Sequence, residues 1–183
     1  NYNVVVGDEA GTAITTGDLN TAVGYLSAAA ITTGERNSAF GSYALRTNII
    51  GTNNVANGFQ SLYYNTSSHN TAVGSLSLLA NTTGASNTAV GKSSLSSNTT
   101  GAYNVAVGTN ALDANTTGVS LTTLGFQALS SSVTDVDTVA VGTNAGVNAT
   151  TSYSVIVGSQ ANGLGAMTGD SNSYLGYASG YAN

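Results

Sequence analysis

The chain of 183 residues has a formal net charge of −5 and only three basic residues, Arg36, Arg46 and Lys92. Nucleic-acid binding depends on clustered Lys and Arg side chains, and these three are scattered, so we expect no nucleic-acid partner. The absence of cysteine excludes disulfides and thiolate metal sites. No run approaches the ~18 apolar residues of a membrane span, so no membrane insertion is expected.

A five-residue frame of the type Asn-Thr-Ala-Val-Gly recurs along the whole chain. Its strong and weak copies occupy residues 3–7, 20–24, 37–41, 54–58, 70–74, 87–91, 104–108, 121–125, 138–142, 154–158 and 172–176. A short fixed period is typical of a solenoid, in which each repeat forms one coil that covers its neighbours. The sequence predicts a single all-β array over residues 1–183, a parallel β-solenoid (β-roll) of about eleven 17-residue coils. Because no polar capping unit is recognisable, we expect a fragment of a longer fibre.

Each frame is expected to contain a short strand that is apolar on both faces. The residue before the final glycine is apolar in every copy except the one with Asn57, and the residue before that is usually alanine. Adjacent strand residues point to opposite faces, so alanines line one face and valines the other. Strands that are apolar on both sides are usually covered on both sides. We therefore expect other copies of the chain to cover the outward face, most simply in a homotrimer.

A small residue followed by a large one comes three and four residues after the frame's glycine. We expect a second short strand or a corner here, with a core formed by Leu45, Leu62, Leu78, Leu95, Leu112 and Leu129. Another glycine, seven residues before the frame's glycine, closes a Thr-Thr-Gly turn in which we expect a positive φ. These turn glycines are Gly17, Gly34, Gly84, Gly101 and Gly118.

Two columns of asparagine are expected to be structural. Residues such as Asn81 and Asn98 open the Thr-Thr-Gly turn, where their side chains can bond to the local backbone. The first residue of the frame is asparagine in six consecutive coils, and identical amides ~4.8 Å apart can form a hydrogen-bonded ladder. This column contains Asn20, Asn37, Asn54, Asn70, Asn87 and Asn104. The Asn-x-Ser/Thr triplets that begin at Asn65, Asn81, Asn98, Asn115 and Asn148 arise from the repeat and give little support for glycosylation.

Chemistry-bearing residues are sparse, and we predict no catalytic, cofactor-binding or metal-binding residue. The single histidine, His69, lies in a column that varies from coil to coil, which indicates an exposed corner. A catalytic histidine would need an oriented nucleophile and acid. Asp135 and Asp137 are too few for a calcium site, which takes six or more oxygen ligands. Weak binding candidates at the exposed corner are Tyr2, Arg36, His69, Tyr103 and Tyr153, whose tyrosines could stack on sugars.

The alternation of Asn-Thr-Ala-Val-Gly with Ser-Leu-x-x-Asn-Thr-Thr-Gly resembles repeats of phage tail fibres and bacterial surface fibres. It is more distantly similar to the head repeats of trimeric autotransporter adhesins, the YadA-like heads, although its period is longer than theirs. The resemblance covers almost the whole chain and is strongest over residues 70–112. It implies a trimeric β-roll with an adhesive surface, located outside the cell on a virion tail fibre or a bacterial surface, and binding a host-surface glycan or protein receptor.

The leading hypothesis is a non-enzymatic structural and adhesive fibre segment with a polar Thr, Ser and Asn surface. The alternative is an ice-binding solenoid, in which the Thr-Thr pairs such as Thr82-Thr83 and Thr99-Thr100 would present hydroxyls at regular spacing. The column breaks at Ile49-Ile50, which speaks against a continuous ice-binding face. An acyltransferase solenoid of the hexapeptide type lacks both the six-residue period and a placed catalytic histidine.

Overall fold

The computed structural model describes residues 2–162 and 169–180, and its strands are three residues long. They are β1 (Val4–Val6), β2 (Thr21–Val23), β3 (Ser38–Phe40), β4 (Val55–Asn57), β5 (Thr71–Val73), β6 (Thr88–Val90), β7 (Val105–Val107), β8 (Thr122–Leu124), β9 (Val139–Val141), β10 (Val155–Val157) and β11 (Ser173–Leu175). The described residues contain no helix.

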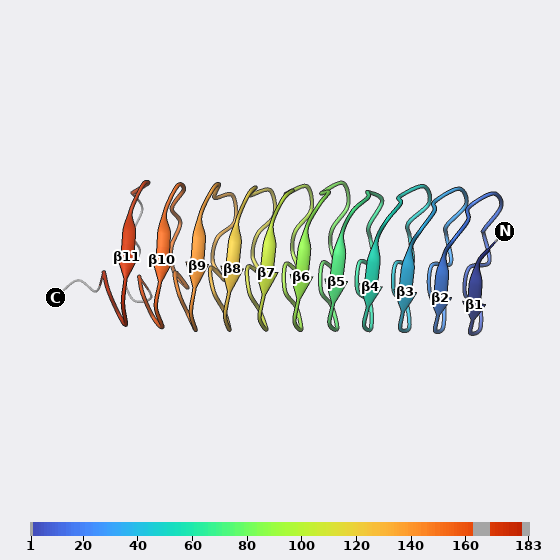
Figure 1. The fold of residues 1–183 in the computed structure, drawn as a ribbon, viewed down its shortest axis with the longest axis horizontal. Coiled ribbons are helices and arrows are strands. Elements are labelled where there is room, and N and C mark those ends of the chain that lie inside the picture. Colours follow the sequence, from blue (N-terminus) through green and yellow to red (C-terminus); the bar gives the residue numbers. More distant parts are fainter. Residues whose placement is uncertain (1, 163–168, 181–183) are drawn as a thin grey trace.

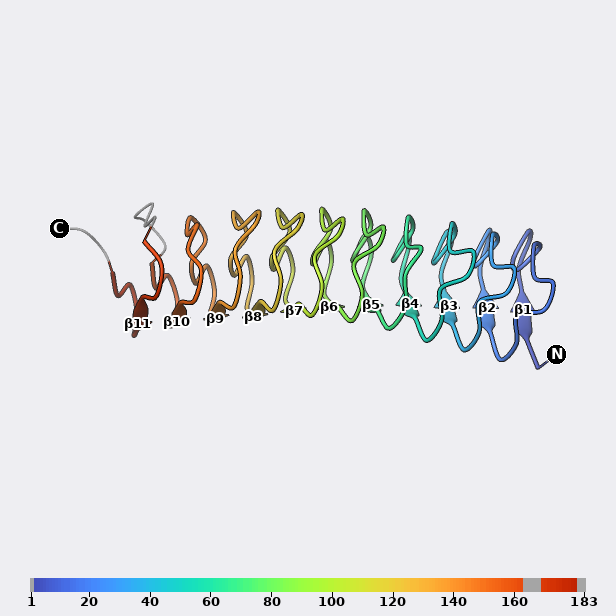
Figure 2. The same cartoon turned by 90° about the horizontal axis from the view of Figure 1, so that it is seen from above.

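The eleven strands form one parallel sheet in chain order, from β1 at one end to β11 at the other (Figure 1). Matching positions pair across neighbouring coils, as Ala72 with Ala89 and Ala89 with Ala106. The strands lie along one long side of the rod, and the turns form the other sides (Figure 2). The predicted parallel β-solenoid with a period near 17 residues is confirmed. At ~4.8 Å per strand, the sheet extends about 50 Å.

Each strand is followed by the frame's glycine, and from Gly7 to Gly158 a side chain would not fit at this position. These glycines, which we call the strand glycines, have φ between 120° and 146°. A Cβ built on Gly91 would lie 2.5 Å from the carbonyl oxygen of Gly108 in the next coil. From Gly7 to Gly158 the corresponding distances are 2.2 to 2.7 Å. The strand glycines therefore set how closely the coils can stack.

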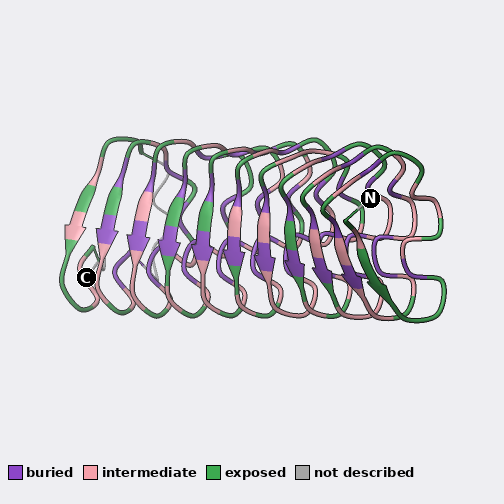
Figure 3. Cartoon of the chain, turned by 45° about the vertical axis from the view of Figure 1, so that its right-hand side comes forward, coloured by how far each residue is buried: buried purple, intermediate pink, exposed green. Residues whose placement is uncertain are grey.

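Alternation along the strand separates an inner from an outer face (Figure 3). The central residue of the strand is buried in β2 through β10, as with Ala22 and Ala89. The residues on either side of it are half-buried or exposed, as with Thr88 and Val90 in β6. The expected two apolar faces are present, with alanine turned inward and valine outward.

The leucines that follow the strand fill the core from a turn rather than from a second strand. Leu45, Leu95 and their equivalents are fully buried, and they have φ near +50°. This left-handed conformation costs roughly 1–2 kcal/mol for a residue with a Cβ. It is held by bonds between coils, for example from Leu45 N–H to Ser61 O at 3.0 Å. Of the two expected alternatives, strand or corner, the structure has the corner.

The expected positive φ at the Thr-Thr-Gly turn is wrong. Among the described non-strand glycines, positive φ occurs only at Gly11, Gly146 and Gly180, and none of the predicted turn glycines has it. Glycine is needed in these turns because there is no room for a side chain. A Cβ on Gly84 would lie 2.2 Å from Gly101 O and 2.6 Å from Asn81 Oδ1. The turn glycine thus makes room for the next coil and for the asparagine that opens its own turn.

Both asparagine columns are buried, but they bond differently from each other. In the strand column, Asn20 Oδ1 accepts from the backbone N–H of Asn37 at 3.0 Å, and Asn20 Nδ2 donates to Gly34 O at 2.9 Å. Amide-to-amide bonds in this column are found between Asn20, Asn37 and Asn54. The strand asparagines therefore mainly attach each coil to the backbone of the next.

The turn column (Asn48, Asn65, Asn81, Asn98 and Asn115) carries an unbroken amide ladder from Asn65 to Asn115, and Asn48 bonds only within its own turn. Asn98 Nδ2 donates to Asn81 Oδ1 at 2.7 Å, and Asn115 Nδ2 donates to Asn98 Oδ1 at 2.8 Å. The same side chains also bond to their own turns, as Asn98 Nδ2 does to Gly101 O at 3.0 Å. The predicted local bond is confirmed, and the ladder expected of the strand column runs mainly through the turn column.

Candidate functional surface

The corner column precedes each strand by two residues and contains all five binding candidates. Arg36, His69, Tyr103 and Tyr153 are exposed with φ between 55° and 64°, and Tyr2 is exposed at the first coil. The left-handed backbone turns these side chains away from the core. Their N–H groups bond to the preceding coil, as His69 N–H does to Thr52 O at 3.0 Å.

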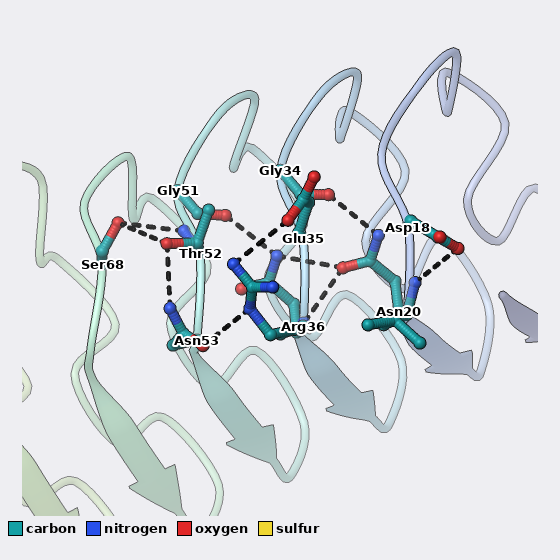
Figure 4. Close-up of polar contacts among 11 residues, drawn as sticks. Asp18, Asn20, Gly34, Glu35, Arg36, Gly51, Thr52, Asn53 and Ser68 are labelled. Carbon is teal, nitrogen blue, oxygen red and sulfur yellow. Dashed lines mark hydrogen bonds and ion pairs between the residues drawn. The ribbon is translucent and has the colours of Figure 1, made fainter. Parts of the chain in front are cut away.

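The corner candidates are spread along the rod and do not form one cluster. Successive members are two or three coils apart, which corresponds to roughly 10–15 Å along the axis. Arg36 is already engaged, because its guanidinium lies 3.1 Å from Glu35 Oε2 and donates to Asn53 Oδ1 at 3.3 Å (Figure 4). The column can offer single contact points at intervals, but it does not enclose a small ligand.

Asp135 and Asp137 lie in different environments although they are two residues apart. Asp135 is buried, and its Oδ2 accepts from Thr151 N–H at 3.2 Å, while Asp137 is exposed. Burial raises the pKa of Asp135 above its usual value. Within residues 2–162 and 169–180, no three His, Cys, Asp or Glu side chains are placed to hold a metal ion together.

Threonine hydroxyls in the Thr-Thr column serve the backbone of the next coil. Thr82 Oγ1 donates to Thr99 O at 2.9 Å, and Thr99 Oγ1 donates to Thr116 O at 3.0 Å. The second threonine of each pair, such as Thr83, is exposed. The column lies in turns and not on the sheet, and at Ile49 and Ile50 it presents exposed aliphatic side chains.

Four of the five asparagines that begin Asn-x-Ser/Thr triplets are inside the solenoid. Asn65, Asn81, Asn98 and Asn115 are fully buried, and their amides are bonded, so glycan attachment is incompatible with the folded coil. Asn148 is exposed. The repeated triplets are therefore a consequence of the turn ladder, as the repeat pattern indicated.

The outer face of the sheet presents an apolar stripe that we call the outer stripe. It consists of the apolar residues at the strand ends together with the valines at the strand starts, and Asn57 at the end of β4 interrupts the column of strand-end residues. The exposed members include Phe40, Val90 at 36% and Leu124 at 51%. Further exposed members are Val4, Val6, Val55, Val105, Val155 and Leu175. Single exposed apolar residues are ordinary, but a row of them along one face marks an interaction surface.

An aromatic cluster on the second to fourth coils was not predicted from the sequence. The rings of Tyr25 and Tyr43 have centroids 5.3 Å apart, and Tyr43 lies 6.1 Å from Phe59. Tyr43 also lies 6.2 Å from Tyr63, whose ring is 4.5 Å from that of Tyr64. Tyr25 and Phe59 directly follow their strand glycines, whereas Tyr43, Tyr63 and Tyr64 occupy other positions, so no single column contains the cluster. Mapping them onto adjacent coils would have brought them together.

Comparison with protein-family models, with curated proteins and with solved structures gave no match. No helix in the described part of the chain is long and apolar enough to cross a membrane.

Proposed function

We propose that this chain is a segment of an extracellular structural and adhesive fibre that works as a homotrimer, on a virion tail fibre or on a bacterial surface. The outer stripe carries the proposal. It extends over the strands of an 11-stranded sheet, and monomers rarely expose continuous apolar patches larger than a few hundred Å². A closed cyclic assembly would bury the stripe and leave the polar corners and turns in water.

Two further features support a fibre. The sheet grows by one strand per coil without a change of register, so length can be extended by repetition. The repeat also resembles those of tail fibres and trimeric adhesin heads, and this resemblance favours three chains over two. In this proposal the chain has no enzymatic role, and its exposed corners and turns face the receptor.

Light scattering at micromolar concentration tests the assembly. The expected species has three times the protomer mass of 18.1 kDa. Val90→Asp in the outer stripe should dissociate or destabilise it, since a charge in an apolar interface costs several kcal/mol. Ser86→Asp, at an exposed corner of the same coil, should change stability by about half a kcal/mol or less. A stable folded monomer, or equal effects of the two substitutions, would refute the trimer.

Ice binding is the second candidate, favoured by the regular spacing of exposed threonines such as Thr83, Thr100 and Thr117. The first threonine of each pair has its hydroxyl proton engaged by a carbonyl, which leaves the second to order water. Thermal hysteresis that is lost on Thr100→Tyr and retained in Val90→Asp would support this reading. Absence of thermal hysteresis in the unmutated chain would exclude it.

A further inference from the structure

Arg46 is held between two tyrosine rings in the aromatic cluster. Its guanidinium carbon lies 5.7 Å from the ring centroid of Tyr43 and 5.5 Å from that of Tyr63, and Nη1 donates to the Tyr63 hydroxyl. Stacking of this kind fixes an arginine that would otherwise sample many rotamers. The guanidinium is therefore preorganised before any ligand arrives.

The described residues provide Arg46 with no carboxylate partner. Arg36, which precedes β3 whereas Arg46 follows it, is paired with Glu35. Arg46 has five N–H donors, and the protein contact described above uses one of them. Its half-buried position weakens competition from water. A preorganised and unneutralised guanidinium is suited to a carboxylate, which it can bind through two parallel hydrogen bonds.

An open pocket is lined in part by Arg46. Its volume is about 370 Å³, and it is lined by Leu26, Ala29, Ala30, Arg46, Thr47 and Ile49. The pocket is a shallow depression that is largely open to solvent, and its walls are mostly apolar with one cation. The lining residues belong to the turns after β2 and β3, so the outer stripe and the pocket lie on different parts of the coil.

We propose that this pocket binds an acidic sugar residue that carries both a carboxylate and an N-acyl group. The carboxylate would pair with Arg46, and the acyl methyl group would enter the apolar part formed by Leu26, Ala30 and Ile49. The exposed rings of Tyr25 and Tyr64 flank the cluster and offer surfaces on which neighbouring sugars of a glycan can stack. The proposal rests on the adhesive function above and gives that function a ligand class.

Other anions fit less well. A polyanion such as a nucleic acid or a sulfated chain needs several cations, and the whole sequence has three in a chain of net charge −5. An uncharged sugar would leave the positive charge of the guanidinium without a carboxylate to neutralise it. An acidic peptide could satisfy Arg46, but it would not explain the small apolar pocket beside a single cation.

Ligand-observed NMR with the full chain tests the chemistry directly. The probes are the methyl glycosides of N-acetylneuraminic acid and of an N-acetylated hexosaminuronic acid, which represent an animal-cell and a bacterial-capsule source of the same groups. Methyl N-acetylglucosaminide lacks the carboxylate, and methyl glucuronide lacks the acyl group. We expect at least one acidic N-acyl probe to bind at least about tenfold more tightly than both partial probes. The tighter of the two acids identifies the source.

Substitutions test which residues form the sugar-binding site. Arg46→Met should weaken binding by at least about tenfold, whereas Arg36→Met, which removes a cation already paired with Glu35, should not change it. Ala30→Leu fills the pocket while it leaves Arg46 in place, and it should also weaken binding. Melting temperatures of all three variants establish that they fold.

Several results would overturn the proposal. These are no binding of either acid at about 20 mM, equal binding of the uncharged glycoside, or full binding by folded Arg46→Met. A glutamate-containing peptide that binds more tightly at the same residues would replace the sugar with a protein ligand. Attachment of beads coated with the chain to cells separates this inference from the adhesive function. Attachment that is unchanged by Arg46→Met refutes the site alone, and sugar binding without attachment refutes the adhesive function alone.

Discussion

Replacement of strand glycines by alanine at two positions should distinguish the stability lost through poorer coil stacking from the stability lost through backbone strain. Gly91 has φ +133°, and an added Cβ would meet Gly108 O at 2.5 Å and Gly108 C at 2.6 Å. Gly176, at the last strand, has φ +120°, and an added Cβ there has nothing within 4 Å. The two positions share the unfavourable conformation and differ in contact with a following coil.

The expected magnitudes follow from these distances. Strain at a φ that side chains rarely adopt costs about 1–3 kcal/mol at either position. At Gly91 the neighbouring coil must also move by roughly 1 Å, because carbon and oxygen need more than 3 Å. This movement stretches bonds between the two coils, from Gly108 N–H to Val90 O at 2.8 Å and from Asn110 N–H to Lys92 O at 3.0 Å. At about 1 kcal/mol for each bond, Gly91→Ala should cost roughly 3–5 kcal/mol.

Thermal unfolding at one protomer concentration measures the difference. For a chain of this length, 1 kcal/mol corresponds to roughly 2–4 °C in Tm. Gly91→Ala should therefore lower Tm by roughly 10 °C and Gly176→Ala by a few degrees. Hydrogen exchange should show that the loss in Gly91→Ala is centred on β6 and β7, since coils in a solenoid interact mainly with their neighbours. Equal losses for the two variants would refute the claim that close stacking requires the glycine.

Two further substitutions test the corners and the buried acid. Leu19 is exposed with φ +57°, so Leu19→Asn should stabilise the fold by about 0.5–1 kcal/mol in a denaturant titration, whereas Thr33→Asn, exposed without a positive φ, should not. Because burial raises the folded-state pKa of Asp135 above its unfolded value, stability from this group is complete below the unfolded pKa and lost as pH rises through the folded one. Asp135→Asn should therefore raise Tm at pH ~7 but not in strong acid. The control Asp137→Asn, at an exposed position, should not raise Tm at pH ~7. A gain for Asp135→Asn that persists in acid would contradict this.

The sequence was sufficient to predict the strand positions, the register and the inward alanine column. These features depend on a period and on residue size, and both are visible in one chain. The buried leucines were also identified, because leucine recurs four positions after the strand glycine in the six central coils, from Gly41 to Gly125.

The conformation of the corners could not be read from residue type. Leu45 and Leu95 adopt a left-handed backbone that usually indicates glycine, and bonds between coils hold them there. Conversely, Gly84 and Gly101 suggested positive φ but are required for space. The pocket lined by Arg46 could not be predicted from the sequence for a different reason. Its walls come from different repeat positions of two coils, so a comparison of columns does not assemble it.

The turn asparagine ladder leads to a last prediction, in which a single substitution should be disproportionately costly. Asn98→Ala removes the donor to Asn81 Oδ1 and the acceptor of Asn115 Nδ2, both fully buried. Gly101 O keeps a donor, because Asn87 Nδ2 also bonds to it at 2.8 Å. An orphaned buried polar group costs about 1–3 kcal/mol, so the loss should be about 2–4 kcal/mol.

Replacement of the whole turn column should cost far less at each position. The equivalent residue of the second coil is Ile31, which is fully buried, so the coil accepts an aliphatic side chain there. Simultaneous substitution by isoleucine removes both partners of every amide-to-amide bond within the column; the substituted residues are Asn48, Asn65, Asn81, Asn98 and Asn115. The remaining loss comes from groups outside the column, since the backbone N–H groups of Gly51 and Gly118 lose their side-chain acceptors. Denaturant unfolding of Asn98→Ala, Asn98→Ile and the fivefold variant measures the difference. If the variant with five substitutions loses five times as much unfolding free energy as Asn98→Ile, the amides act independently. A smaller loss would show that the amides act as one network and that the destabilisation comes from interrupting it.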